Sequence, residues 1–391
     1  MKILLLGVGL QGKAALHDLA NSVQVSHIIA ADANIAALRS YASQLNSPKI
    51  TPVQLDVRDH ARVRELMRAG DVVIALLPQT FRLEMARLAI DSGAHYVETS
   101  YALPEYAELG CSAAARGLTL LPEFGLDPGI DLVLVGRAIG ELDEVHELHA
   151  YGTGVPEPQA ANNPLKYKIS WTFAGVLGAY QRPARMLKDG QVISLTPGQM
   201  FSKEFLHHVD VEDIGHMEAY YNGDAVKYLD VFGIQETTRS TGRYSLRWPG
   251  HSAYWKKMVE LGFLSEEPLQ VGDVQVSPRQ FVHDLLAPQL QYAADERDIA
   301  AIRIDVRGLK NGQRKRIIYQ MVDRRDLETG LLAMQRTVGY TASIGAQMIL
   351  SGAIQKRGLL APGKDVSSDA LIAELQKRNI NITRSELDWL I

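Results

Sequence analysis

The chain has 391 residues, more than one hydrophobic core usually holds, so its length predicts two domains. Hydrophobic residues make up 46% and charged residues 22%, the balance of a soluble globular protein. The net charge of −4 does not favour nucleic acid or a membrane as a partner. A single cysteine excludes an internal disulfide, and no apolar run reaches the roughly 18 residues of a membrane-spanning helix. We therefore expect a cytoplasmic enzyme.

A glycine-rich turn near the N-terminus is the strongest motif. An apolar run at residues 3–6 leads into Gly7, Gly9 and Gly12, a helical pattern follows, and a second apolar run ends at Asp32. In this G-x-G-x-x-G spacing the first glycine permits a tight turn, the second lets the backbone approach a pyrophosphate, and the third lets helix and strand pack closely. The N-terminus of the helix attracts the phosphates. The motif predicts a dinucleotide site, and the alternative is a glycine-rich turn that binds nothing.

Short apolar runs alternate with helical patterns through the first 130 residues. The expected strands are residues 3–6, 28–31, 50–55, 72–77, 96–97 and 118–121, with helices such as 61–68 and 81–92 between them. This alternation predicts the α/β class, with a Rossmann-type doubly wound parallel sheet whose ligands lie at the carboxyl ends of the strands. Residues 1–130 are therefore the predicted dinucleotide-binding domain.

The pattern changes after residue 130. Residues 145–151 alternate like a half-buried strand, and residues 301–306 and 316–322 flank Asn311-Gly312, which predicts an antiparallel hairpin. Residues 131–337 are the predicted second domain, an α+β unit on a mixed or antiparallel sheet that binds substrate and forms a dimer. Helical patterns at 337–350 and 369–378 suggest that residues 338–391 return to pack on the first domain.

Two acids bear on the cofactor. A carboxylate at Asp32 accepts hydrogen bonds from ribose hydroxyls and repels a 2′-phosphate, which favours NAD over NADP. Asp56 follows the third strand, where it either contacts the adenine amino group or caps the next helix.

Polar residues also close the later strands of the first domain. Glu98, Ser100 and Tyr101 follow one strand, and Glu123 and Asp127 follow the next. Because parallel strands end at one edge of a sheet, these acids, a hydroxyl and a phenol should face one crevice. An isolated Asp-Pro-Gly such as the one that begins at Asp127 would otherwise indicate only a turn.

No metal site is expected. The adjacent residues His207 and His208 point apart on a helix, and no HExxH or paired Cys/His spacing occurs.

Several motifs together support a family resemblance. Beside the glycine turn they are ETSY at 98–101, EFGLDPGID at 123–131, NNPLKYKISW at 162–171, MLKDG at 186–190, YSLRWPG at 244–250 and TVGYTA at 337–342. With them the chain, from residue 1 to about residue 362, resembles the saccharopine dehydrogenase family, and most of all the glutamate-forming saccharopine reductases. It is also similar to the L-lysine 6-dehydrogenases.

The resemblance implies a Rossmann domain joined to a substrate domain in a homodimer, and the oxidation of saccharopine to glutamate and aminoadipate semialdehyde. It implies cofactor contacts at Gly7, Gly9, Gln11, Gly12, Asp32, Asp56, Leu77 and Pro78. It places substrate at Ser100, Tyr101, Asp127, Lys168, Asn222 and Arg247, with Arg247 as a carboxylate clamp.

One position departs from the family. Saccharopine reductases carry an arginine in Tyr-Pro-Asn-Arg-Asp-Ser where this chain has Gly223, and that arginine is expected to hold a substrate carboxylate. Either another cation replaces it, for which Lys166, Lys168, Lys227 and Arg243 are candidates, or the substrate lacks that carboxylate.

The expected chemistry is removal of hydride from a C–N carbon after the amine loses a proton. Asp127 is the expected base, Tyr101 a proton relay and Lys168 a weaker candidate. Three functions remain open at this stage: NAD-dependent saccharopine oxidation, oxidation of lysine or another amine, and a catalytically silent NAD-binding interaction protein.

Overall fold

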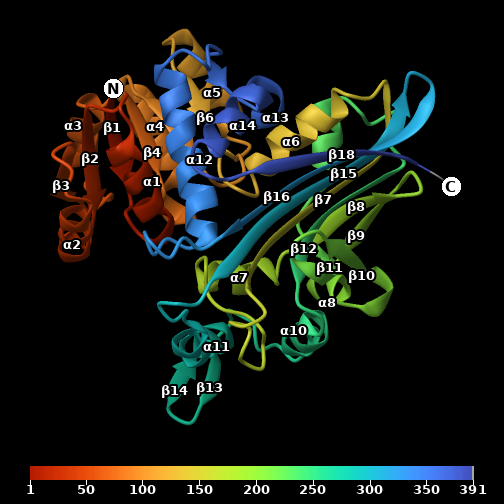
Figure 1. Cartoon of the computed structure of the whole chain (residues 1–391). Helices are drawn as coiled ribbons and strands as arrows, with labels where there is room; N and C mark the ends of the chain where they lie inside the picture. Colours follow the sequence, from red (N-terminus) through yellow and green to blue (C-terminus); the bar gives the residue numbers. More distant parts are fainter. Residues whose placement is uncertain (390–391) are drawn as a thin grey trace. The chain divides into compact units, whose positions relative to one another are not determined.

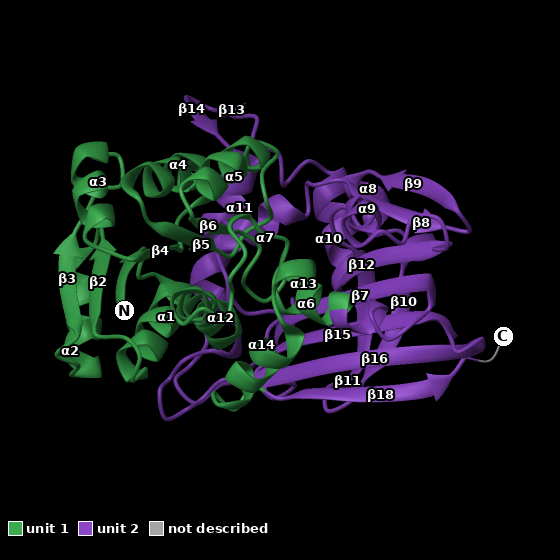
Figure 2. Ribbon diagram, turned by 90° about the horizontal axis from the view of Figure 1, so that it is seen from above, with its two compact units in different colours: residues 1–136, 335–380 green, residues 137–334, 381–391 purple. Residues whose placement is uncertain are grey.

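The computed structural model describes residues 1–389 and divides into two compact units. Unit 1 comprises Met1–Gly136 with Gln335–Ile380, and unit 2 comprises Arg137–Met334 with the residues from Asn381 onward (Figure 2). The chain passes from one unit to the other within α6 (Ile130–Ile139) and α12 (Ala333–Leu350), and again after Ile380.

The sheet of unit 1 is parallel throughout. Within the described residues it has seven strands in the order β17-β6-β5-β4-β1-β2-β3 (Figure 1). Their bounds are β1 (Lys2–Leu6), β2 (His27–Asp32), β3 (Ile50–Gln54), β4 (Val72–Ala75), β5 (His95–Glu98), β6 (Thr119–Leu121) and β17 (Gly358–Leu359). In this order ligands bind beyond the carboxyl ends of the strands, where the order reverses between β1 and β4. The predicted α/β class and doubly wound sheet are confirmed.

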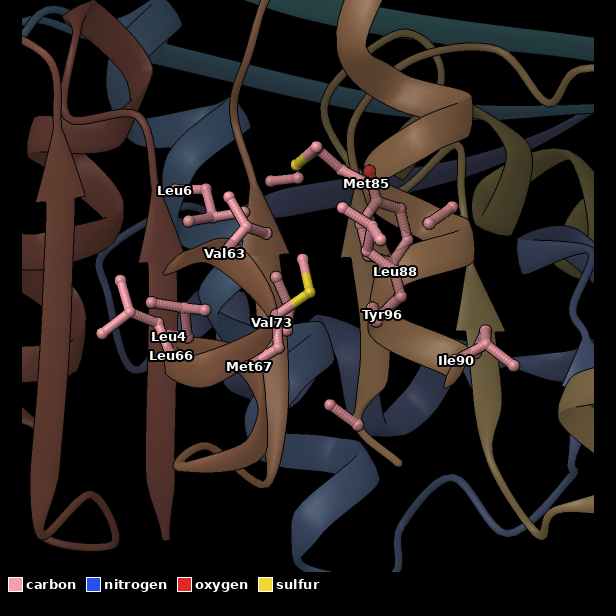
Figure 3. Close-up of a cluster of buried hydrophobic side chains, with 14 of the residues drawn as sticks. Leu4, Leu6, Val63, Leu66, Met67, Val73, Met85, Leu88, Ile90 and Tyr96 are labelled. Atoms are coloured by element: carbon pink, nitrogen blue, oxygen red, sulfur yellow. The ribbon is translucent and has the colours of Figure 1, made fainter. Parts of the chain in front are cut away.

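Helices of unit 1 bury the apolar side chains of this sheet. They are α1 (Leu10–Asn21), α2 (Ile35–Leu45), α3 (His60–Arg68), η1 (Gln79–Phe81), α4 (Arg82–Ser92), α5 (Tyr106–Ala115), α13 (Pro362–Asp365) and α14 (Ser368–Gln376). In the cluster of Figure 3, Leu66 of α3 and Leu88 of α4 pack with Leu4 and Tyr96 of the strands. Burying a leucine contributes about 1.5–3 kcal/mol, so this cluster fixes the strand ends from which the polar loops emerge.

The main sheet of unit 2 is mixed, as predicted. In the described part of the chain it has nine strands in the order β10-β11-β12-β7-β15-β16-β18, with β8 beside β12 and β9 beside β8. Their bounds are β7 (Glu144–Pro156), β8 (Ala184–Lys188), β9 (Gln191–Leu195), β10 (His207–Val211), β11 (Gly215–Tyr221), β12 (Ser240–Arg247), β15 (Asp298–Lys310), β16 (Gln313–Arg324) and β18 (Ile382–Asp388). β7 pairs with β12 in parallel, and the other pairings are antiparallel.

Short helices complete unit 2. They are α7 (Phe173–Ala179), α8 (Pro197–Met200), η2 (Lys203–Phe205), α9 (Lys227–Phe232), α10 (His251–Glu260), α11 (Pro278–Leu286) and η3 (Ala287–Leu290), with the hairpin of β13 (Leu269–Val271) and β14 (Val274–Val276) before α11. Over residues 1–389, no helix combines the length and the apolar character needed to cross a membrane.

The predicted hairpin at Asn311-Gly312 is confirmed. Lys310 pairs with Gln313, which leaves Asn311 and Gly312 as a two-residue loop with φ of 52° and 75°. Positive φ at both central residues is the geometry that an Asn-Gly pair favours, and its twist matches the flanking strands. Because this turn fixes the register, β15 and β16 pair without a break from Lys310 and Gln313 to Ile299 and Arg324.

The end of the chain differs from the expectation that residues 338–391 are helices packed on the first domain. α12, from Gln335 onward, α13 and α14 belong to unit 1, but β18 is an edge strand of unit 2 paired with β16. Its side chains are mostly exposed, so its sequence has no apolar alternation from which a strand could be predicted. Ion pairs hold it instead, from Lys310 to Glu386 at 2.8 Å and from Lys315 to Asp388 at 2.6 Å.

His207 of β10 packs among aromatic rings in unit 2. Its ring lies edge-on to Tyr151 and Tyr244, with centroids 5.7 and 4.7 Å away, and its Nε2 is 3.2 Å from the Tyr151 hydroxyl. Burial, together with the neighbouring His149 and His208, lowers the pKa of His207 to about 4. In an unfolded chain a histidine takes up its proton near pH 6.5.

We expect His207 to make the protein sensitive to mild acid. The unfolded chain binds this proton more readily than the folded one, so the free energy of unfolding falls as the pH drops from about 6.5 towards 4. His207→Phe keeps a ring but removes the titration, so its urea midpoint should fall less between about pH 7 and pH 5 than the wild-type midpoint. The exposed His208 on the same strand provides the control variant, His208→Phe. An equal fall in wild type and His207→Phe would contradict the prediction.

Candidate functional site

The glycine turn lies between β1 and α1. Gly7 has a φ of 86°, and a Cβ there would lie 2.5 Å from the Leu76 carbonyl oxygen. A Cβ on Gly12 would lie 2.1 Å from the Gly7 oxygen, so these two glycines are required by the fold itself. Gly9 is different, because a Cβ there would meet nothing within 4 Å. Gly9 also precedes α1, which begins without a side-chain cap, so open space and a helix N-terminus meet at one point.

This turn fits a pyrophosphate. Leu77 and Pro78 follow β4, and the Leu77 side chain lies 3.2 Å from the Cβ position of Gly7. Gln11 lies in the first turn of α1. The predicted cofactor residues around the turn are thus brought together at the carboxyl edge of the sheet, although their contacts with a cofactor remain a prediction.

Asp32, at the end of β2, braces the glycine turn. One carboxylate oxygen accepts a hydrogen bond from Val8 N at 2.8 Å, and the other accepts one from Asn34 N, also at 2.8 Å. Backbone N–H groups therefore engage both oxygens that were expected to meet the ribose. Asp32 is explained by the shape of the loop, and its presence alone does not select a cofactor.

Asp56 lies in the loop after β3. At the start of this loop, Leu55 N donates a hydrogen bond to the Asp32 carbonyl at 3.0 Å. The Asp56 carboxylate pairs with the Arg58 guanidinium at 2.6 Å, and this pairing lowers the pKa of Asp56 to about 2. The helix-capping alternative applies to Asp59, which accepts from Arg62 N and caps α3.

The loops after β5 and β6 are joined to each other. Glu123 N donates to the Ser100 carbonyl and Phe124 N to the Glu98 carbonyl, both at 3.0 Å. Above these bonds the Tyr101 hydroxyl donates to Asp127 Oδ1 at 3.0 Å. The predicted phenol and carboxylate are therefore in direct contact at the carboxyl edge of the sheet. A paired hydroxyl and carboxylate can pass a proton between them.

A tight turn holds Asp127 in place. Gly125 N donates to the Pro128 carbonyl at 2.9 Å, and Ile130 N donates to the Gly125 carbonyl at 3.0 Å. Gly129 has a φ of 148°, and a Cβ there would lie 2.1 Å from the Gly125 oxygen. The glycines that flank Asp127 are thus required for this close approach.

The two glutamates that were expected to face the crevice are instead buried in the protein. Glu98 is only 1% exposed, and it forms an ion pair with Arg82 in the interior. Glu123 is also buried. A buried carboxylate needs a partner, and Arg82 supplies it to Glu98 from the start of α4. Nothing in the sequence indicated Arg82, which occupies an ordinary position in a helical pattern.

In unit 2, Arg247 ends β12 in an aromatic environment. Its Nη1 donates to the Leu246 carbonyl at 2.8 Å, and its guanidinium lies 5.8 Å from the centre of the Tyr167 ring. Its Nε is buried and makes no hydrogen bond within residues 1–389. Such a donor is costly to leave unsatisfied, so it suits an anionic ligand.

Aromatic residues surround this guanidinium. Tyr180 and His251 are buried, and the Tyr180 hydroxyl lies 2.9 Å from His251 Nε2. The Tyr220 ring stacks on the His251 ring, with 6.0 Å between the ring centres. Burial, and then the charge of Arg247, lowers the pKa of His251 well below its usual value, so this ring stays neutral. Sequence analysis missed Tyr180 and His251.

The other predicted substrate residues of unit 2 have different environments. Lys168 is buried, and its ammonium lies 2.5 Å from both oxygens of Glu296, so the pair neutralises its charge. Asn222 follows β11, where its N–H donates to the Arg243 carbonyl at 2.8 Å. Their contacts with a substrate remain predictions.

Gly223 has a φ of 69°, and a Cβ there would meet nothing within 4 Å. Space for a longer side chain therefore exists at the position where the family has arginine. Among residues 1–389, no group of three or more His, Cys, Asp or Glu side chains is placed to hold a metal ion.

Two family models match the chain in succession. The saccharopine dehydrogenase NADP binding domain matches residues 3–121, and the saccharopine dehydrogenase C-terminal domain matches residues 125–380. The second match alone covers more than half of the chain.

Known proteins are similar over nearly the whole length. The mitochondrial alpha-aminoadipic semialdehyde synthase of Mus musculus is 28% identical over 92% of this chain, and the chain spans 45% of that relative, about half its length. The saccharopine dehydrogenase (NADP(+), L-glutamate-forming) of Saccharomyces cerevisiae is 26% identical over 96% of this chain and 97% of its own length. The solved structure of apo saccharopine dehydrogenase (L-Glu forming) from Saccharomyces cerevisiae matches with a TM-score of 0.86 at 24% identity over 99% of each chain, which supports the fold.

The expectation of NAD as the cofactor is wrong. The matching N-terminal family model is an NADP binding domain, and the yeast relative is named for NADP(+). The error came from Asp32, whose carboxylate was assigned to a ribose but is engaged by the backbone of its own loop. From the two matching domains, which follow one another along the chain, the protein belongs to the saccharopine dehydrogenase family.

Proposed function

We propose that this chain oxidises saccharopine at the C–N bond on its aminoadipate side, with NADP as the hydride acceptor, and releases glutamate and aminoadipate semialdehyde. The observation that carries the proposal is the contact between the Tyr101 hydroxyl and Asp127 Oδ1 at the carboxyl edge of the sheet whose first strand leads into the glycine turn. The names of the relatives support the substrate.

For the cofactor we propose a cradle built from the glycine turn. Gly7, Gly9 and Gly12, with the first turn of α1 at Gln11, would hold the pyrophosphate, because Gly9 leaves open space in front of the helix N-terminus. Leu77 and Pro78 would contact the cofactor from the end of β4. Asp32 keeps the turn in shape, and Arg58 beside Asp56 offers a guanidinium for the adenosine phosphate. When bound, NADP supplies an acceptor for the hydride.

Asp127 prepares the amine. A secondary amine near its ordinary pKa of about 10 is protonated at pH 7, and nitrogen can stabilise a neighbouring cation only through a free lone pair. Asp127 takes that proton, and Tyr101, which donates to it, relays protons with the solvent. The C–H bond on the aminoadipate side then breaks, its electron pair leaves as hydride, and a C=N bond forms.

Hydrolysis completes the reaction. Water adds to the imine carbon, the nitrogen regains a proton, and the C–N bond breaks to give the amine of glutamate and the aldehyde. Asp127 and Tyr101 carry these protons in the reverse sense, because the acid and the base exchange roles between the two halves. Ser100, in the same loop as Tyr101, would line the pocket.

In unit 2 we propose Arg247 as the clamp for a substrate carboxylate. Its buried Nε has no partner among the described residues, and a carboxylate would accept bonds from two of its nitrogens. Lys168 is neutralised by Glu296, so it and Asn222 would form the wall rather than the clamp. A homodimer and a cytoplasmic location stay predictions.

A side-by-side substrate screen tests the function. With NADP, we expect saccharopine to give NADPH and glutamate, while lysine and other amino acids give rates lower by at least about 100-fold, since each of them lacks at least one of the carboxylates that saccharopine presents. Asp127→Asn keeps the shape of the side chain but cannot accept the proton, so its kcat should fall by about 10²–10⁴ with unchanged NADPH binding. A faster rate with lysine, or full activity of Asp127→Asn, would overturn the proposal.

Two glycine variants test the cofactor cradle. Gly9→Ala adds a methyl group to open space, so the melting temperature should stay within about 2 °C of wild type while NADPH binding weakens at least about tenfold. Gly12→Ala forces a Cβ onto the Gly7 carbonyl, so it should lower the melting temperature. Calorimetry and fluorescence titration of NADPH provide the two readouts. Wild-type NADPH affinity in Gly9→Ala would exclude this cradle.

Arg247→Met tests the clamp. The Nε of Arg247 has no hydrogen-bond partner in the described chain, so removing the guanidinium should leave the melting temperature unchanged or raise it. The variant also loses the charge-assisted pair with a substrate carboxylate, worth about 1.5–3 kcal/mol, so the KM for saccharopine should rise about 10–100-fold. Arg303→Met is the matched control, because Arg303 of β15 also has a buried Nε without a partner in the described chain. A similar KM for both variants would argue against the clamp.

A further inference from the structure

One buried guanidinium joins three segments of unit 1. Arg82 begins α4, and its side chain is 7% exposed. Its Nε donates to Glu98 Oε2 at 3.0 Å and its Nη2 to Oε1 at 2.5 Å, so it clamps the end of β5 with two bonds. The same Nη2 also donates to the carbonyl oxygen of Tyr101 in a short contact. Arg82 thus connects α4, the last residue of β5 and the loop that follows.

The Glu98 carboxylate is held from its other side as well. The Tyr106 hydroxyl donates to Oε1 at 3.0 Å, and the Tyr96 hydroxyl lies 3.4 Å from Oε2. Burial, and then the charge of Glu98, raises the pKa of both phenols, so they remain protonated donors. Tyr96 also belongs to the apolar cluster of Figure 3. The carboxylate has no freedom to turn towards a ligand, and it fixes the guanidinium instead.

We infer that Arg82 and Glu98 are positioning residues for the Tyr101–Asp127 pair. This inference rests on the proposed function, in which that pair moves protons. Arg82 holds the Tyr101 backbone carbonyl, and the hydroxyl of the same residue reaches Asp127 Oδ1. Fixing the carbonyl fixes the peptide plane and hence the direction in which the phenol leaves the chain.

The position of the loop explains why such an anchor is needed. Residues 99–105 lie between β5 and α5 and have no regular secondary structure, so no ladder of backbone bonds orients them. Ser100 accepts from Glu123 N, and the next carbonyl is the one that Arg82 binds. A charge-assisted bond from a buried guanidinium is stronger than a neutral bond to water, so it restricts this loop more tightly.

The test uses a double variant that avoids an unpaired buried charge. Arg82→Met removes the guanidinium, and Glu98→Gln removes the charge while keeping an acceptor for the Tyr106 hydroxyl. The matched control is Asp18→Asn with Arg378→Met. Asp18 and Arg378 form another buried pair in unit 1, with Arg378 Nε 2.5 Å from Asp18 Oδ1 and side chains 12% and 9% exposed. Arg82→Lys provides the conservative variant.

We expect the Arg82/Glu98 double variant to lose kcat for saccharopine by at least about 30-fold with NADPH affinity changed less than about twofold. The control pair should lower the melting temperature to a similar extent but change kcat less than about threefold. Arg82→Lys, which retains one donor group, should have a kcat between that of the wild type and that of the Arg82/Glu98 double variant. Adding Tyr101→Phe should lower kcat in wild type but little further in the double variant, because the hydroxyl is already displaced. Equal losses in control and test pairs, or full additivity with Tyr101→Phe, would overturn the inference.

Hydrogen exchange separates this inference from the function itself. Exchange of the amides in residues 99–105 should speed up at least about fivefold in the Arg82/Glu98 double variant and stay unchanged in the Asp18/Arg378 control. This measurement needs no substrate, so it decides the positioning role even if saccharopine is not oxidised. Unchanged exchange in residues 99–105 would show that Arg82 does not hold the loop.

Discussion

The buried pair of Arg82 and Glu98 is the constraint on which the candidate site depends. Breaking such a pair by removing one partner typically costs about 3–5 kcal/mol, because the remaining charge is left without compensation. In unit 1 this ion pair lies at the end of β5, where the chain leaves the sheet and the Tyr101 loop begins. The parallel sheet brings the β6 loop to the same edge, so a single interior ion pair controls the distance between a phenol and Asp127. Side chains that contact no substrate thus define the geometry of those that are proposed to do so.

Arg82 of unit 1 and Arg247 of unit 2 are both buried arginines, but their environments are opposite. Arg82 has acceptors for Nε and for Nη2 and contributes to a closed network, whereas Arg247 of unit 2 leaves its Nε buried without a protein acceptor in residues 1–389. A satisfied ion pair rigidifies its surroundings, and an unsatisfied donor lowers stability until a ligand binds. The neutral His251 beside Arg247 adds no competing charge, since burial and the guanidinium keep its pKa low. Arg82 is therefore engaged within the fold of unit 1, whereas the Nε of Arg247 in unit 2 is the donor that the proposed carboxylate clamp would use.

Local signals in the sequence predicted the parts of the structure that local rules control. The glycine turn was predictable because Gly7 and Gly12 meet specific steric demands of the fold, and Asn311-Gly312 because its φ angles fix a hairpin. Tyr101 and Asp127 could be placed together, since parallel strands end at one edge. The Arg82–Glu98 pair could not, because it depends on the packing of α4 against β5, and the sequence pattern does not show which buried acid a helix will neutralise. Asp32 misled for a similar reason, as its backbone bonds exist only in the folded loop.

The departure at Gly223 has a local explanation in the backbone. Its φ of 69° lies in the left-handed region, which costs roughly 1–2 kcal/mol for a residue with a side chain and almost nothing for glycine. The turn is also anchored without a side chain, because Arg185 N donates to the Gly223 carbonyl at 2.9 Å, and Arg185 pairs with Asp224. Glycine therefore relieves strain in a turn that its neighbours already hold. Under the proposed function, the substrate carboxylate would then be left to Arg247, whose buried Nε has no acceptor within residues 1–389.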